Sequence, residues 1–253
     1  MDNKGYLSDP KKRFSSRVEN YIKFRPKYPT MIIKFFKKKE ILKEKSIVAD
    51  IGSGTGILSE IFLKNGNRVI GVEPNQEMRK AGLEQLKKYP NFTSVDGSAE
   101  STGLENESVD IITAGQAFHW FDLAKTKREF RRILKPDGYA VIIWNNRRKS
   151  GEGFSSQYEN FVLKYGTDVK EVRKKEVGIE YFYPCQLEVF YNYQDLDFNG
   201  LKGRLLSVSY IPLEGHPNYE KMLMDLETLF NLNEQEGKVR IEYDTEVYYG
   251  QLN

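Results

Sequence analysis

The sequence predicts an α/β protein with a doubly wound, mostly parallel sheet, N-terminal helices and an inserted cap. Two observations predict this fold class. Short continuous apolar runs alternate with segments of helical spacing from residue 46 to residue 144. A glycine-rich turn follows the first apolar run, where a strand would pass into a helix. Continuous apolar strands are typical of parallel sheets, so we expect helices on both faces of this one.

The first strand and helix are the clearest elements. Residues 46–51 are short and apolar enough for a buried strand, and residues 57–65 change to helical spacing. The apolar side chains that share one helical face are Ile57, Leu58, Ile61 and Phe62. We expect this helix to end at Asn65-Gly66, because glycine adopts the left-handed conformation at low cost.

The same alternation continues along the chain. Residues 68–73 predict a second strand, and Asn75 is a suitable N-cap for a helix that extends to about Lys88. Residues 92–95 and 109–114 predict the third and fourth strands. The predicted alternation ends with a helix over 123–134, a turn over 135–138 and a fifth strand over 139–144.

We divide the chain into four segments. Residues 1–45 form an N-terminal helical arm, and residues 46–146 form the sheet core. Residues 147–186 are rich in charged and aromatic residues without strand–helix alternation, so we interpret them as an inserted helical cap. Residues 187–253 complete the sheet and a lid. Their predicted elements are strands over 187–196 and 239–252 and helices over 201–208 and 218–230.

Composition excludes several functional classes. Lysine plus arginine number 39 and aspartate plus glutamate 36, so the net charge of +3 does not support a nucleic-acid partner. The single cysteine, Cys185, excludes an internal disulfide and leaves too few thiolates for a zinc ribbon or an iron–sulfur cluster, and we expect no metal. No window approaches the ~18 apolar residues of a membrane span, and the first residues lack the apolar core of a signal peptide. We therefore expect a cytoplasmic protein without a membrane partner, and its oligomeric state stays open.

The glycine-rich turn and a nearby acid predict a ligand site. Ligands of open α/β sheets bind at the carboxyl ends of the strands, where glycine lets the backbone approach closely. The spacing here is Gly52-x-Gly54-x-Gly56, one residue shorter than the G-x-G-x-x-G of dinucleotide-binding folds. Glu73 ends the second strand, 21 residues after Gly52, where an acid can accept hydrogen bonds from both hydroxyls of a ribose. The alternative for Glu73 is a solvated residue at a strand end.

These stretches together resemble class I S-adenosylmethionine-dependent methyltransferases. The resemblance covers residues 46–144 and rests on VADIGSGTGIL, VIGVEPNQEM, FTSVDGSAE, VDIITAGQAFHWFD and LKPDGYAVIIW, which occur in that order. The earlier stretch YIKFRPKYP is similar to the segment that precedes the core in small-molecule methyltransferases of the trans-aconitate and ubiquinone type.

The resemblance implies S-adenosylmethionine as the cofactor and S-adenosylhomocysteine as its product. It places Asp50 toward the ammonium group of the cofactor, Glu73 on the ribose, and Met78 beside the adenine. The full set that it implies for cofactor binding is Asp50, Gly52, Ser53, Gly54, Glu73, Pro74, Met78, Gly97, Ser98, Ala99 and Gln116.

The catalytic and acceptor residues follow from position and chemistry. Methyl transfer from a sulfonium needs mainly alignment, which can supply roughly 7–11 kcal/mol of barrier reduction, so a dedicated base is optional. His119 follows the fourth strand and can take a proton near neutral pH, although a structural histidine packed beneath Trp120 is the alternative. The candidates for contact with a small-molecule acceptor are Tyr21, Arg25, Trp120, Trp144 and Asn145, with packing as the alternative for the aromatic residues. For Arg25 the resemblance implies contact with the methionine carboxylate of the cofactor or with a substrate carboxylate, and a surface ion pair is the alternative.

Two functions remain from this reasoning. The first is methyl transfer to a small-molecule acceptor by O- or C-methylation, and the acceptor itself is not identified. The second is a non-catalytic S-adenosylmethionine-binding regulatory protein, because a fold does not determine a function. A nucleic-acid or protein methyltransferase is less favoured, because Gly115-Gln116-Ala117-Phe118 stands where an aromatic–proline tetrapeptide would be expected. A nicotinamide dehydrogenase is disfavoured by the glycine spacing.

Overall fold

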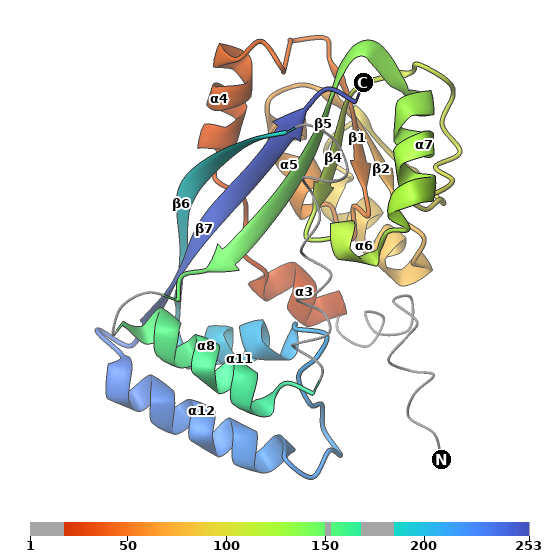
Figure 1. The fold of residues 1–253 in the computed structure, drawn as a ribbon. Helices are drawn as coiled ribbons and strands as arrows, with labels where there is room; N and C mark the ends of the chain where they lie inside the picture. Colours follow the sequence, from red (N-terminus) through yellow and green to blue (C-terminus); the bar gives the residue numbers. More distant parts are fainter. Residues whose placement is uncertain (1–17, 150–152, 168–184, 253) are drawn as a thin grey trace.

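A seven-stranded sheet forms the centre of the protein, whose structure is a computed structural model that describes residues 18–149, 153–167 and 185–252 (Figure 1). The strand order is β3-β2-β1-β4-β5-β7-β6. The first five strands along the chain pair in parallel, and β7 pairs antiparallel with both β5 and β6. The strands are β1 (Ile47–Ile51), β2 (Arg68–Val72), β3 (Phe92–Val95), β4 (Val109–Gly115), β5 (Leu134–Arg147), β6 (Gln186–Leu196) and β7 (Val239–Gly250). The predicted mostly parallel, doubly wound sheet is confirmed.

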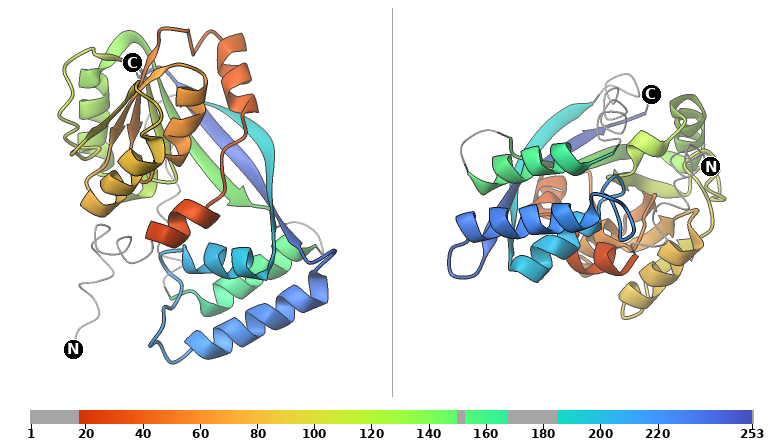
Figure 2. Two further views of the ribbon diagram at one scale, coloured as in Figure 1. Left: turned by 180° about the vertical axis from the view of Figure 1, so that it is seen from behind. Right: turned by 90° about the horizontal axis from the view of Figure 1, so that it is seen from below.

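Helices cover both faces of the parallel strands, and successive strand residues enter opposite cores. Val48 packs in one cluster and Ala49 in the other, and Ile143 and Trp144 at the end of β5 separate in the same way. This follows from the two-residue period of a strand. One face packs against α4, α5 and the end of α6, and the other against α7 (Figures 1 and 2). The bounds of the helices after the first strand are α5 (Ile57–Lys64), α6 (Gln76–Leu86), the short 3₁₀ helix η1 (Phe118–Trp120) and α7 (Leu123–Ile133).

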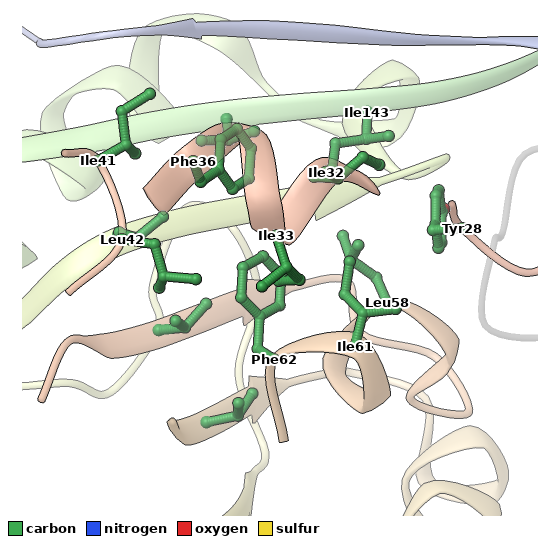
Figure 3. Packing of buried hydrophobic residues seen from close by; sticks show 14 of the residues in the cluster. Tyr28, Ile32, Ile33, Phe36, Ile41, Leu42, Leu58, Ile61, Phe62 and Ile143 are labelled. Carbon is green, nitrogen blue, oxygen red and sulfur yellow. The ribbon is translucent and has the colours of Figure 1, made fainter. Parts of the chain in front are cut away.

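The described part of the predicted N-terminal arm contains two helices, α3 (Val18–Phe24) and α4 (Met31–Lys38). Residues 1–17 of that arm lie outside the described residues. Helix α4 buries Ile32, Ile33 and Phe36, which are spaced to share one helical face. Figure 3 shows these side chains packed against residues of α5 such as Phe62. Helix α4 is therefore part of the layer that covers the sheet, whereas α3 contacts a helix much later in the chain, α11 (Phe198–Leu206).

Among the described residues, three helices form a separate lobe below the parallel strands (Figure 1). They are α8 (Phe154–Tyr165), α11 (Phe198–Leu206) and α12 (Tyr219–Asn233), and their buried side chains form one cluster with the far ends of the long strands. The lobe thus combines α8, which precedes β6 in the chain, with α11 and α12, which follow it. Parts of the predicted cap, residues 150–152 and 168–184, lie outside the described residues.

Strand β5 differs from its prediction. The sequence predicts a turn over 135–138 and a strand over 139–144, but the strand begins at Leu134 and continues to Arg147. The ladder with β4 is irregular at its start, because Val109 pairs with Leu134 and Ile111 with Tyr139. At the other end, pairing with β7 continues to Arg147. Tertiary pairing therefore extends the strand through a polar Asn-Asn-Arg stretch that its own sequence does not favour.

We predict that replacing Phe36 by alanine lowers the free energy of unfolding by about 3–5 kcal/mol, because it removes a fully buried ring between α4 and the sheet. Met31 lies on the same helix and is 54% exposed, so Met31→Ala should change stability by less than about 0.5 kcal/mol. Urea denaturation followed by circular dichroism measures both values. Equal, small effects would show that α4 is peripheral to folding.

Candidate functional site

The turn between β1 and α5 lies against the loop after β4. Gly52 has a φ of +69°, which favours glycine, and a Cβ at this position would lie 2.6 Å from the Cβ of Ala117. The amide N–H groups of Gly52 and Ser53 both donate to the carbonyl oxygen of Val72 at the end of β2. The turn is therefore fastened to β2 and packed against the β4 loop, at the point where the strand order reverses between β1 and β4. Such switch points are where open α/β sheets bind ligands.

Glu73 follows β2 directly and is only 8% exposed. Its Oε2 accepts a hydrogen bond from the Gly54 amide at 2.9 Å, and its Oε1 accepts one from the Asn75 amide at 2.8 Å. Burial raises the pKa of the Glu73 carboxyl, while these backbone bonds act in the opposite direction. A carboxylate offers about four acceptor positions, so the two oxygens can accept further bonds. Glu73 is therefore not a solvated strand end.

Asp50 lies within β1 and is 1% exposed. The Ser59 hydroxyl donates to its Oδ2 at 2.6 Å, and the Thr113 hydroxyl donates to its Oδ1 at 3.1 Å. Burial raises the pKa of Asp50 to about 6, although both hydroxyl bonds oppose the shift. The carboxyl thus connects β1 with α5 and β4 while it lines the site.

The loop after β4 carries an unusual backbone and the candidate base. Gln116 has a φ of +58°, an uncommon value for a residue with a side chain, and its amide donates to the Ile143 carbonyl at 3.0 Å. Strained backbone of this kind is often found at functional sites. The His119 ring lies 4.6 Å from the Trp120 ring and 5.4 Å from the Trp144 ring, measured between centroids. His119 thus combines aromatic packing with a place in the pocket wall.

Two pockets meet at this end of the sheet. The first, which we call the Glu73 pocket, contains Glu73, Met78 and Trp120 in its wall. The second, the arginine pocket, contains Arg25 and Arg204 and extends between the sheet and the helical lobe. The residues that line both pockets are Tyr21, Gly52, Gly115 and Gln116. A ligand bound in one pocket would therefore lie close to a ligand in the other.

Most of the predicted site residues line these pockets. Those in the Glu73 pocket are Gly54, Glu73, Pro74, Met78, Ser98, Ala99 and Trp120. Those in the arginine pocket are Arg25, Asp50, Ser53, His119 and Asn145. The two pockets share the predicted residues Tyr21, Gly52 and Gln116. Trp120 was expected on the acceptor side but lies on the Glu73 side.

Gly97 and Trp144 line neither pocket. A Cβ on Gly97 would lie 2.7 Å from the carbonyl oxygen of Thr102, so this glycine permits a close backbone approach next to the pocket. Trp144 is buried in the core beneath the His119 ring. The predicted acceptor role of Trp144 is corrected, because its side chain is buried in the core, whereas the following residue Asn145 lines the arginine pocket.

The sequence prediction did not name every lining residue as part of the site, and those it missed include Tyr28, Arg147, Glu159 and Arg204. Arg147 Nε and Glu159 Oε2 form an ion pair of 2.6 Å in which both side chains are buried. Arg204 stands in an otherwise largely apolar helical stretch, and a lone arginine there was the available signal. Tyr28, Arg147 and Arg204 come from segments far apart in sequence, which is why local patterns did not connect them.

Over the described ranges, no group of three or more His, Cys, Asp or Glu side chains is arranged to hold a metal ion. Over the same ranges, none of the helices has the length and apolar character needed to cross a membrane.

Sequence comparison identifies the sheet core. Residues 49–142 match the profile of a family described as a methyltransferase domain. A methyltransferase-like protein of uncharacterised activity from Schizosaccharomyces pombe is 36% identical over 138 residues, which are 54% of this chain and 52% of the relative. The ubiquinone/menaquinone biosynthesis C-methyltransferase of Campylobacter jejuni is 30% identical over 131 residues, 49% of this chain and 54% of the relative. The chain spans about half the length of the curated relatives it matches.

Solved structures share the fold over more of the chain. A candidate type II methyltransferase from Anaeromyxobacter dehalogenans aligns with a TM-score of 0.71 at 20% identity and covers 90% of this chain and 98% of its own. The YcgJ protein from Bacillus subtilis aligns with a TM-score of 0.53 at 18% identity, over 88% of this chain and 98% of its own. At these identities the likeness concerns the fold.

The chain thus has the fold of a solved methyltransferase structure, and its two pockets lie at the switch point of the sheet. Residues 49–142 are the part of the chain that resembles methyltransferase domains in sequence. The resemblance drawn from the five sequence stretches is confirmed, and a ubiquinone-type enzyme is among the relatives.

We predict that the stability of the protein falls as the Asp50 carboxyl ionises. Its pKa is about 6 in the folded chain against an ordinary value of 3.8, so the folded state binds more protons than the unfolded state between these values. The wild type should therefore lose up to about 3 kcal/mol of stability between about pH 4 and about pH 7, a loss that Asp50→Asn cannot show.

Urea denaturation of the wild type and Asp50→Asn across this pH range tests the prediction. The exposed residue Asp137, near the start of β5, provides a control, since Asp137→Asn should follow the wild-type curve. Parallel pH profiles for the wild type and Asp50→Asn would contradict a raised pKa at Asp50.

Proposed function

We propose that the protein transfers a methyl group from S-adenosylmethionine to a small-molecule acceptor. The observation that carries this proposal is the junction of two pockets at Gly52, Gly115 and Gln116, at the carboxyl ends of β1 and β4. A two-substrate transfer needs two adjoining sites whose reacting atoms meet at a shared boundary. The relationship of residues 49–142 to the methyltransferase domain family supports the reaction class.

The Glu73 pocket suits the nucleoside part of the cofactor. Glu73 has acceptor positions left for two ribose hydroxyls after its bonds to the Gly54 and Asn75 amides. Pro74 and Met78 provide an apolar wall, and a polarisable thioether packs well against an aromatic base. The amino-acid part would then extend past Gly52 toward Asp50, in agreement with the roles that the family resemblance implies.

The arginine pocket suits the acceptor. Bound S-adenosylmethionine would supply a methyl group carried on a positively charged sulfur. When a nucleophile of the acceptor attacks the methyl carbon in line with the carbon–sulfur bond, that bond breaks and the sulfur departs as a neutral thioether. The chain must align the nucleophile, exclude water and receive a proton where the acceptor loses one. His119 lines this pocket next to the shared boundary residues, so its imidazole can orient an acceptor hydroxyl or activated carbon and take its proton.

The acceptor is proposed to be small because the pocket lies between the sheet and the lobe rather than on an open basic face. A relative that acts in ubiquinone and menaquinone biosynthesis supports a small acceptor for this chain as well. A regulatory protein that binds the cofactor without turnover is the competing function, and an assay over a metabolite panel separates the two.

We predict that calorimetry detects binding of S-adenosylhomocysteine and that Glu73→Ala weakens it by about 1–3 kcal/mol, because ribose hydroxyls would lose their buried acceptor. Glu77 is a control acid in the first turn of α6, with a side chain that is 51% exposed, so Glu77→Ala should bind like the wild type. Binding of NAD with comparable affinity, or unchanged affinity in Glu73→Ala, would rule out the ribose assignment.

We predict that His119→Ala lowers turnover by roughly 10²–10⁴-fold while the affinity for S-adenosylhomocysteine stays unchanged. The acceptor for this assay comes from the metabolite panel. His216 is the other histidine and lies in an exposed loop, so His216→Ala should retain full activity.

His119→Gln then separates two roles of the ring. An amide can donate and accept hydrogen bonds but does not take up a proton near neutral pH. Activity restored by glutamine would assign an orienting role, and continued loss would assign proton removal. Full activity in both variants would contradict either role and make His119 structural.

A further inference from the structure

Two arginines meet on the lobe side of the arginine pocket. Arg25, which follows α3, donates from Nη2 to the Ser207 carbonyl oxygen at 3.0 Å. Arg204 of α11 donates from Nη1 to the Ser207 hydroxyl at 3.4 Å and from Nε to the Tyr243 hydroxyl at 3.2 Å. Both guanidinium groups line the pocket, and both are held close to one residue at the end of α11.

Neither arginine has an acidic partner within the part of the chain that the structure describes. Arg204 is only 3% exposed. Burial lowers the pKa of Arg25, and the positive charge of Arg204 lowers it further, despite an opposite effect of Tyr21. By contrast, Arg147 in the same pocket is neutralised by its ion pair with Glu159. Buried positive charges held close together are costly unless a negative group lies between or beside them.

Donors in the same pocket also have no acceptor among the described residues. Arg25 Nε and Asn145 Nδ2 are both buried without a hydrogen-bond partner. Asn145 already uses its Oδ1 to accept from Thr245, so its amide nitrogen is the end available to a ligand. Buried donors are seldom left unsatisfied, and here both belong to residues of the pocket wall.

We propose that Arg25 and Arg204, with Asn145, form a subsite for an anionic group of the methyl acceptor, a carboxylate or a phosphate. This inference rests on the proposed function, because it assigns the subsite to the acceptor. Guanidinium groups bind both anions through paired hydrogen bonds, and burial strengthens those bonds relative to water. The acceptor is therefore an acid with a nucleophilic atom that reaches His119 while its anion lies on the two arginines.

The carboxylate of the cofactor is the other possible source of negative charge. A single carboxylate near the Gly52 turn can meet Arg25, because the neighbouring Tyr21, whose ring lies 4.6 Å from the Arg25 guanidinium carbon, borders both pockets. Arg204 belongs to the lobe helix α11 and lines the arginine pocket but not the Glu73 pocket. Arg204 is therefore the residue whose replacement distinguishes an acceptor anion from the cofactor carboxylate.

The test titrates succinate and inorganic phosphate into protein saturated with S-adenosylhomocysteine, at constant ionic strength, with neutral succinamide as the comparison probe. We expect saturable binding of at least one anion, no binding of succinamide, and a loss of about tenfold or more in anion affinity for Arg204→Gln. Affinity for S-adenosylhomocysteine should not change in this variant.

Two further variants make the result specific. Arg148→Gln removes the same charge from a half-buried arginine that lies outside the pocket and is paired with Asp244, and it should leave anion binding intact. Arg204→Lys keeps the charge without the planar fork and should bind the anion with intermediate affinity. If circular dichroism shows that Arg204→Gln does not fold, Arg204→Lys replaces it as the test of the anion site.

Three outcomes overturn the proposal: no anion binding by the wild type with S-adenosylhomocysteine bound, equal losses in Arg148→Gln and Arg204→Gln, or a loss of S-adenosylhomocysteine affinity in Arg204→Gln without an anion site. The last outcome would place Arg204 on the cofactor carboxylate. If the wild type does not bind S-adenosylhomocysteine, the proposed function fails. The anion site would still be judged by the same titrations of ligand-free protein.

Discussion

The buried carboxylate of Glu73 is the constraint on which the site depends. An acid in this position is costly unless hydrogen bonds replace water, and the Gly54 and Asn75 amides supply them. The turn after β1 and the start of α6 are thereby held around one side chain. The same carboxylate faces a pocket with acceptor positions to spare. The side chain that holds the loop in place therefore also presents acceptor atoms to the pocket.

The long strands decide how the second pocket is built. Strands β5, β6 and β7 extend beyond the parallel strands to the helical lobe, so the lobe is joined to the core through continuous sheet (Figure 1). The pocket between them draws on Arg25, Arg147 and Arg204, all of which lie outside residues 49–142. Similarity to known methyltransferase domains therefore covers nearly all of the Glu73 pocket but only part of the arginine pocket.

Burial is the common electrostatic feature of the site. It is the largest cause of the raised pKa values of Asp50 and Glu73 and of the lowered pKa of Arg25. A site poor in water suits a methyl transfer, because water would compete as a nucleophile and weaken the hydrogen bonds that align the reactants. Charges without an acidic partner in such a site point to a ligand that neutralises them, and within the described ranges the two arginines meet that description.

The sequence by itself determined the parallel core and the Glu73 pocket, because both depend on residues close together along the chain. Apolar runs of strand length, the glycine spacing and an acid ending β2 are local patterns, and each was placed correctly. Only tertiary structure decided that β5 continues to Arg147, that Trp144 is buried while Asn145 faces the pocket, and that Arg25 meets Arg204 across 179 positions of sequence. These features arise from strand pairing and from charges brought together by folding, and no local periodicity encodes a contact between distant segments.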